Sequence, residues 1–69
     1  MSKYIIGERI KSLDELVECD LVYFVATGYK KIYHRGWFMS WQIHMAQKMI
    51  DHGYLYRAER RKENEEDQV

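Results

Sequence analysis

Three histidines and one cysteine are the side chains of this chain best suited to acid–base, nucleophilic or metal chemistry: Cys19, His34, His44 and His52. No Asp or Glu stands at a spacing that would orient one of the histidines as a catalytic base. His44 and His52 are eight residues apart, whereas a helix holds a shared metal ion between residues four apart. The sequence therefore predicts a non-enzymatic protein with no catalytic residue, no metal site and no cofactor.

Cys19 follows a predicted short helix instead of preceding one, so no helix N-terminus lowers its pKa. A nucleophilic thiol also needs a nearby base, and none is close to it in the sequence. We expect a buried, unreactive thiol. Since a single cysteine cannot form an intramolecular disulfide, and the first residues resemble neither a signal peptide nor a membrane span, we expect a cytoplasmic location.

The glycines give no sign of a phosphate-binding loop. All four are isolated in the sequence, at Gly7, Gly28, Gly36 and Gly53. Loops that hold nucleotide phosphates need several glycines in one short motif. Nucleotide binding of the P-loop or Rossmann kind is therefore excluded.

Large apolar side chains are abundant, with two Trp, six Tyr, two Phe and four Met among 69 residues. On a helical period, the segment 37–52 presents an apolar arc of about 200°, whereas a surface helix needs a stripe of only about 100°. One sheet cannot cover so wide an arc, so part of it is predicted to contact a protein partner or a second copy in a homodimer. The residues predicted at this interface are Trp37, Phe38, Trp41 and Met45.

A second interpretation is a small single-stranded nucleic-acid-binding protein. Aromatic and basic residues alternate along the segment 29–35, and the last predicted strand adds one of each kind. Sheet faces of this composition hold single strands by stacking rings on bases while cations follow the backbone. The candidate residues are Tyr29, Lys31, Tyr33, Arg35, Tyr56 and Arg57.

The charge of the chain is zero overall but is unevenly distributed. Residues 1–20 carry net −2, residues 21–62 carry net +6, and residues 63–69 carry net −4. A basic middle with acidic ends fits a nucleic-acid face with a competing tail, and it also fits a solvated surface that balances itself. The balanced surface is favoured, because zero net charge gives little long-range attraction for phosphate.

The length allows one domain only. We expect a single small α+β domain over residues 1–61 and a disordered acidic tail over residues 62–69, which has no apolar residue before Val69. A core of this size supplies little stability, and neither a disulfide nor a metal supplements it. A small size, the absence of a catalytic site and many aromatic residues are features typical of phage-encoded inhibitors or adaptors that bind host factors, although no motif identifies a family.

The expected fold is a small antiparallel sheet of three or four strands, packed against one long helix and preceded by a short one, in the order β-α-β-β-α-β. The strand at 21–27 is β-branched and aromatic on both faces, which is typical of a central strand. The strand at 29–35 is its outer hairpin partner. The expected elements are strands at 4–6, 21–27, 29–35 and 54–58, a short helix at 13–18 and a long helix at 37–52.

The helix ends are marked by specific residues. Ser12 and Glu15 form a predicted capping box, in which the Ser12 hydroxyl accepts from the Glu15 amide and the Glu15 carboxylate accepts from the Ser12 amide. Gly53 is expected to end the long helix in a left-handed conformation. Gln42 falls inside the apolar arc, so either the helix begins late and leaves Gln42 in an exposed first turn, or its amide has a specific partner.

Overall fold

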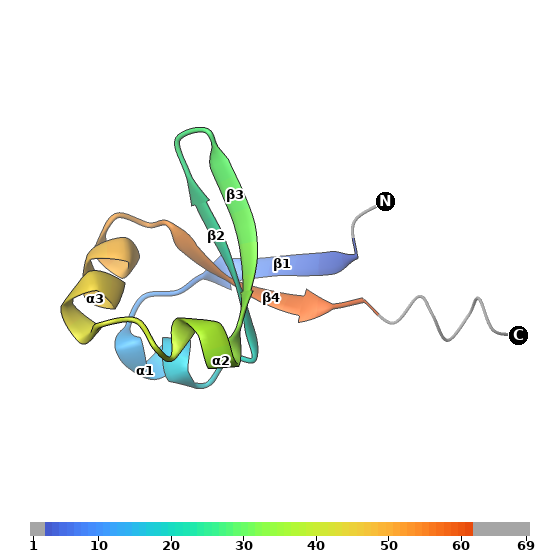
Figure 1. The fold of residues 1–69 in the computed structure, drawn as a ribbon. Coiled ribbons are helices and arrows are strands. Elements are labelled where there is room, and N and C mark those ends of the chain that lie inside the picture. Colours follow the sequence, from blue (N-terminus) through green and yellow to red (C-terminus); the bar gives the residue numbers. More distant parts are fainter. Residues whose placement is uncertain (1–2, 62–69) are drawn as a thin grey trace, which may run out of the picture.

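Four antiparallel strands form the sheet on which this chain is built, in the order β1-β4-β2-β3. The computed structural model describes residues 3–61, so the predicted tail at 62–69 lies outside the described residues. The α+β class and the antiparallel sheet are confirmed. The elements are β1 (Tyr4–Arg9), α1 (Leu13–Val17), β2 (Leu21–Ala26), β3 (Tyr29–His34), α2 (Arg35–Phe38), α3 (Ile43–Asp51) and β4 (Leu55–Arg60), as drawn in Figure 1.

β2 is a central strand, as its sequence predicts. It pairs with β3 over its whole length, from Leu21 opposite His34 to Ala26 opposite Tyr29. On its other side it pairs with β4, from Leu21 opposite Ala58 to Phe24 opposite Leu55. The helices cover the face that holds Val22 and Phe24, while Leu21, Tyr23 and Val25 lie on the opposite face, so the continuous apolar run of β2 exceeds what the helices bury.

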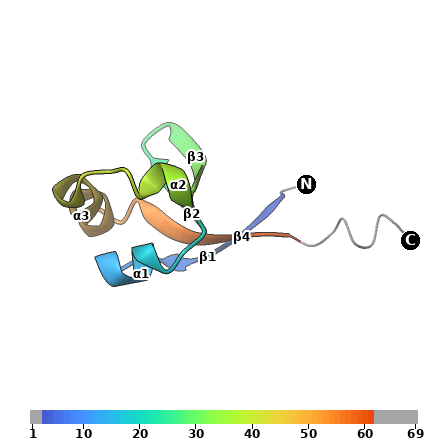
Figure 2. The same ribbon diagram turned by 60° about the horizontal axis from the view of Figure 1, so that its bottom comes forward.

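One core lies between a single face of the sheet and the helices. In Figures 1 and 2 the three helices gather around one end of the sheet, while the N-terminal half of β1 and the C-terminal half of β4 extend away from them. The sheet residues in the core are Val22 of β2 and Leu55 of β4. Leu55 lies opposite Phe24, which is two residues after Val22 and therefore points to the same face of the sheet. The core residues are Ile10, Leu16, Cys19, Val22, Phe38, Ala46, Ile50 and Leu55.

The predicted long helix at 37–52 is wrong, because the chain forms two short helices there. α2 ends at Phe38 and α3 begins at Ile43, with Gln42 in an extended conformation as the N-cap residue. The Ser40 hydroxyl donates a 2.6 Å hydrogen bond to the Trp37 carbonyl, which competes with helical hydrogen bonding at the break. The order therefore contains one helix more than predicted.

The break also explains the wide apolar arc. A continuous helix would turn many of its apolar side chains away from the sheet. With the bend, Phe38 of α2 and Ala46 and Ile50 of α3 all reach the same core. Gln42 is exposed at the start of α3, which agrees with the first of the two alternatives that the sequence left open, a late start of the helix.

The caps of α1 and α3 are as the sequence predicts, except that one hydrogen bond of the α1 cap has a different donor. The Glu15 amide donates to the Ser12 hydroxyl at 3.2 Å, as predicted, but the Glu15 carboxylate accepts from the amide of Lys11 at 2.8 Å instead of from that of Ser12. Gly53 has φ +78°, and its amide and that of Tyr54 donate to carbonyls of the last helical turn of α3. This pair of bonds is the Schellman motif, which confirms the predicted left-handed cap.

Candidate functional site

The three histidines lie apart from one another in the fold. His34 ends β3, His44 is exposed on α3, and His52 is the C-cap residue of α3, where its ring stacks on Tyr54 at 5.2 Å. Within residues 3–61, no three His, Cys, Asp or Glu side chains gather in a way that would hold a metal ion. A search of the same residues finds no helix that is both long and apolar enough to cross a membrane.

Cys19 is a buried thiol, as the sequence predicts. Its Sγ donates to the Glu15 carbonyl at 3.2 Å, and the guanidinium of Arg57 lies 3.8 Å from it. Burial raises the pKa of Cys19, and the positive charge of Arg57 opposes that effect only in part. The protonated thiol is therefore the favoured form.

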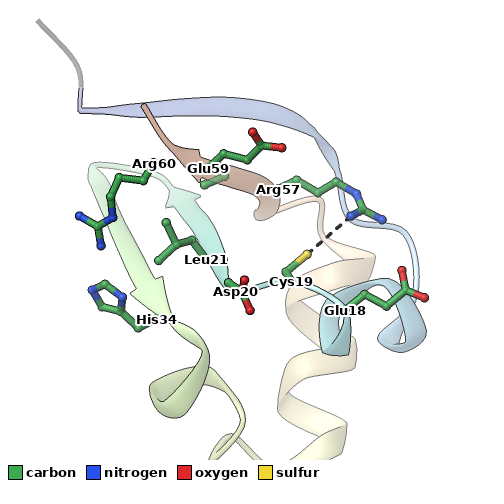
Figure 3. Close-up of a pocket in the computed structure, with 9 residues that line it drawn as sticks. Glu18, Cys19, Asp20, Leu21, His34, Arg57, Glu59 and Arg60 are labelled. Carbon is green, nitrogen blue, oxygen red and sulfur yellow. Dashed lines mark hydrogen bonds between the residues drawn. The ribbon is translucent and has the colours of Figure 1, made fainter. Parts of the chain in front are cut away.

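A pocket of about 490 Å³ lies beside Cys19, where β4 continues past the start of β2 (Figure 3). Leu21 pairs with Ala58, so the last residues of β4 have β1 as a neighbour on one side and the pocket on the other. The charged residues lining the pocket are of both signs, with Glu18, Asp20 and Glu59 against Arg57 and Arg60, and His34 also lines it. This mixture selects no particular class of ligand, so we do not place the binding site here.

A row of aromatic rings crosses the other end of the helix-covered face. Phe24 is its centre, with Tyr54 at 5.8 Å and Tyr33 at 6.3 Å, both in edge-to-face contact. Trp41 then meets Tyr33 edge-on at 5.1 Å, and Trp37 stacks on the same tyrosine at 6.3 Å. Such contacts fix each ring by its neighbours, so the row forms a rigid wall.

Between this row and α3 lies an apolar cleft of about 280 Å³. Five of its six lining side chains are apolar or aromatic, and Gln42 contributes the polar group at one end. Met45 in this lining is 48 % exposed, and Trp37, which stacks on Tyr33, is 63 % exposed. We call this site the aromatic cleft; it is lined by Phe24, Tyr33, Trp41, Gln42, Met45 and Met49.

The elements around the aromatic cleft are basic. The segment 21–50, which forms β2, β3, α2 and nearly all of α3, contains no Asp or Glu. The Lys31 ammonium lies 5.6 Å from the centre of the Tyr33 ring, and Lys48 is exposed on α3. A hydrogen bond with the Tyr29 side chain, followed by burial, raises the pKa of Tyr33, so this phenol is neutral at physiological pH. The cleft thus combines apolar walls with positive surroundings.

Three of the four residues predicted at a protein interface meet at this cleft. Trp41 and Met45 line it, and Trp37 stacks on one of its walls. Phe38 does not join them: it is 2 % exposed and belongs to the core, because the break after α2 turns its ring inward. We therefore remove Phe38 from the predicted interface.

The six residues predicted to bind nucleic acid do not form one platform. Tyr29, Lys31 and Tyr33 alternate onto the helix-covered face, whereas Tyr56 lies opposite Tyr23 on the other face of the sheet. Their arrangement as one surface is wrong, because Tyr56 and Arg57 are neighbours on one strand and therefore point to opposite faces of the sheet.

The two arginines of that predicted set have partners within the fold. Arg35 begins α2 instead of ending a strand, and its guanidinium donates to the carbonyls of Val17 and Cys19. Arg57 lies beside the Cys19 thiol. Both side chains therefore hold the segment between α1 and β2 in place.

Sequence reasoning missed Phe24 and Met49 as part of the candidate site. Phe24 reads as a core residue of a central strand, and Met49 reads as part of the apolar arc. The signal that could have found Phe24 is the hairpin register, which puts Tyr33 and Tyr29 on the same face as Phe24.

Comparison with protein families, with curated proteins and with solved structures finds no match to this chain.

Proposed function

We propose that this chain is a non-enzymatic binding protein that docks a segment of another protein in the aromatic cleft, and so acts as an inhibitor or adaptor. The observation that carries the proposal is an apolar cleft open to the surface, with Met45 exposed in its lining and Trp37 exposed where it stacks on Tyr33. Monomeric proteins seldom leave such side chains together in water, since contiguous apolar surface marks an interaction site.

The composition of the cleft suits a protein partner. Tryptophan and tyrosine dominate the energetic centres of protein interfaces, because they offer large rigid surfaces at a small cost in side-chain entropy. Met45 and Met49 supply the opposite property on the α3 side, since an unbranched thioether adapts its shape to the group it meets. An aliphatic or aromatic anchor of the partner would fill the space between the two walls.

Charge narrows the class of partner. Because Lys31 lies over the Tyr33 ring, Lys48 is exposed on α3, and the segment 21–50 contains no acid, the segment that binds is expected to carry Asp or Glu beside its apolar anchor. A homodimer through this cleft is disfavoured on the same ground, since a two-fold axis would bring the basic rims of two copies together. Sedimentation at micromolar concentration tests this point, and we expect a monomer.

Selection from a random peptide library displayed on phage tests the proposed function. The library is counter-selected against Met45→Glu, which places a negative charge in the cleft while the rest of the surface is unchanged. We expect enriched peptides with one large apolar residue flanked by acids, and binding that shifts the tryptophan emission of the protein. Peptides that bind the parent and Met45→Glu equally well would place the docking surface elsewhere.

A matched control distinguishes the cleft from apolar exposure in general. Ile43 lies on the same helix as Met45 and is more exposed, at 72 %, but it does not line the cleft. Ile43→Gln should therefore leave peptide affinity unchanged, whereas Met45→Gln should weaken it. Equal losses from the two substitutions would count against a defined cleft.

A further inference from the structure

The face of the sheet opposite the helices has a composition of its own, and two of its residues, Leu21 and Ala58, are buried. No residue of this face belongs to the cluster of core residues around Val22 and Leu55 or packs against that cluster. Strand alternation and the register define its members. We call it the open face; it comprises Tyr4, Ile6, Tyr56, Ala58, Arg60, Leu21, Tyr23, Val25, Lys30, Ile32 and His34, with Arg9 at its edge.

Two tyrosines stand at the centre of the open face. Tyr23 and Tyr56 are direct cross-strand partners on β2 and β4, the two inner strands of the sheet. Their ring centres are 6.4 Å apart with an interplanar angle of 57°, and both side chains are partly exposed. Ile32, beside Tyr23 on β3, extends the same row with an apolar side chain. The tyrosine pair is thus held by its neighbours while a part of each ring stays accessible.

Lys30 and Arg60 are the charged side chains that the register places on the open face, and Arg60 and His34 also line the pocket beside Cys19 together with Glu18, Asp20 and Glu59. Lys30, His34 and Arg60 are exposed, and none of the residues that the register assigns to the open face is Asp or Glu; Glu8 lies in the irregular stretch of β1 between Ile6 and Arg9. The Arg60 guanidinium lies 5.8 Å from the centre of the Tyr4 ring, which adds a second aromatic group to the far end of the face. Arg9 runs past Gly53 toward α3, so we do not count it among the accessible cations.

From this juxtaposition we propose that the open face binds single-stranded nucleic acid, with bases stacked on Tyr23 and Tyr56 and phosphates beside Lys30, His34 and Arg60. Aromatic rings bind every base through its π-face, and cations on both sides of the rings follow a backbone that crosses the strands. A duplex is excluded as the preferred ligand, because its bases are stacked on one another and cannot reach the rings. This site is independent of the aromatic cleft, which lies on the other face.

Fluorescence anisotropy with a labelled oligo-dT and oligo-rU of about ten nucleotides tests the proposal. We expect binding at about 50 mM salt that weakens steeply toward about 200 mM, with little binding to a duplex of equal length. The double variant Tyr23→Leu/Tyr56→Leu should lose about tenfold in affinity or more, while the corresponding double Phe variant, which still stacks, should bind like the parent. Circular dichroism verifies that each variant is folded.

Lys30 and Lys31 provide a matched pair, because they are neighbours on β3 that point to opposite faces. Lys30→Gln should weaken oligonucleotide binding several-fold and reduce its salt dependence, whereas Lys31→Gln should leave both unchanged. Met45→Glu should also leave oligonucleotide binding unchanged, so failure here is distinguishable from failure of the proposed protein-binding function.

Several results would overturn the proposal. Absence of binding at low salt, equal affinity for the duplex, or equal losses from the Lys30 and Lys31 variants would each contradict a single-strand platform on the open face. Binding of an acidic peptide that the double Leu variant abolishes, with no binding of either oligonucleotide, would assign the open face to a protein.

Discussion

The ring of Trp41 meets that of Tyr33 edge-on, with their centres 5.1 Å apart, and this contact joins β3 to the segment between α2 and α3. Trp41 also packs against the core and lies 6.0 Å from the Phe38 ring. It is therefore both a wall of the aromatic cleft and a support of the fold. Trp37, which is mostly exposed, stacks on Tyr33 but neither lines the cleft nor packs against the core.

This difference predicts two distinct effects on stability. Trp41→Ala should lower the free energy of unfolding by about 2–4 kcal/mol, because it removes a large packed ring and leaves a cavity. Trp37→Ala should change it by less than about 1 kcal/mol, as is usual for exposed residues. Urea denaturation measures both values, and similar losses from the two variants would show that the tryptophans are packed alike.

The glycine that ends α3 predicts a backbone effect. Gly53→Ala should destabilise the protein by about 1–2 kcal/mol, because Gly53 has φ +78° and an L side chain is strained in that region. Gly36 in α2 is the control: a Cβ there meets nothing within 4 Å, so Gly36→Ala should be neutral or stabilise by about 0.5 kcal/mol. Thermal melting of the two variants compares them, and an equal loss at both positions would contradict the conformational explanation.

The buried thiol predicts a dependence of stability on pH. Burial raises the pKa of Cys19 in the folded protein, so the unfolded chain loses this proton at a lower pH than the folded one. The contribution to stability is fully present below the ordinary thiol pKa of about 8.5 and is lost as the pH rises through the higher folded value. Above about pH 8.5, the free energy of unfolding should therefore fall more steeply with rising pH for the parent than for Cys19→Ala.

A reactivity measurement checks the same thiol independently. Iodoacetamide should modify native Cys19 far more slowly at neutral pH than it modifies the unfolded chain, because the thiolate is the reactive form and the folded protein disfavours it. Rapid modification of the native protein would show an accessible, activated thiol and would contradict its burial.

The sequence contained enough information for the sheet but not for its faces. The apolar run of β2 predicts a central strand, and Gly28, which has φ +72°, predicts the hairpin turn. Alternation correctly separates Lys30 from Lys31. Which of the two faces the helices cover depends on packing across the whole domain, however, so Tyr33 was assigned to a solvent-exposed platform although it packs against the core.

The interface prediction failed in part for a related reason. Helical periodicity over 37–52 assumes a continuous helix, and it places Phe38 and Met45 on the same wide arc. The break between α2 and α3 sends Phe38 into the core and leaves Met45 at the cleft. Ser40 and the polar Gln42 are the local signs of that break, but its geometry is decided by the core that both helices share.

The affinity of a selected cleft-binding peptide for three variants tests the docking function most directly. The peptide is titrated against the parent, Met45→Lys and Met45→Glu, with tryptophan emission as the readout. Both substitutions disturb the apolar wall alike, whereas only Met45→Glu repels an acidic segment, so we predict the weakest binding for Met45→Glu and intermediate binding for Met45→Lys. Equal affinity of all three proteins for the peptide would contradict docking in the aromatic cleft.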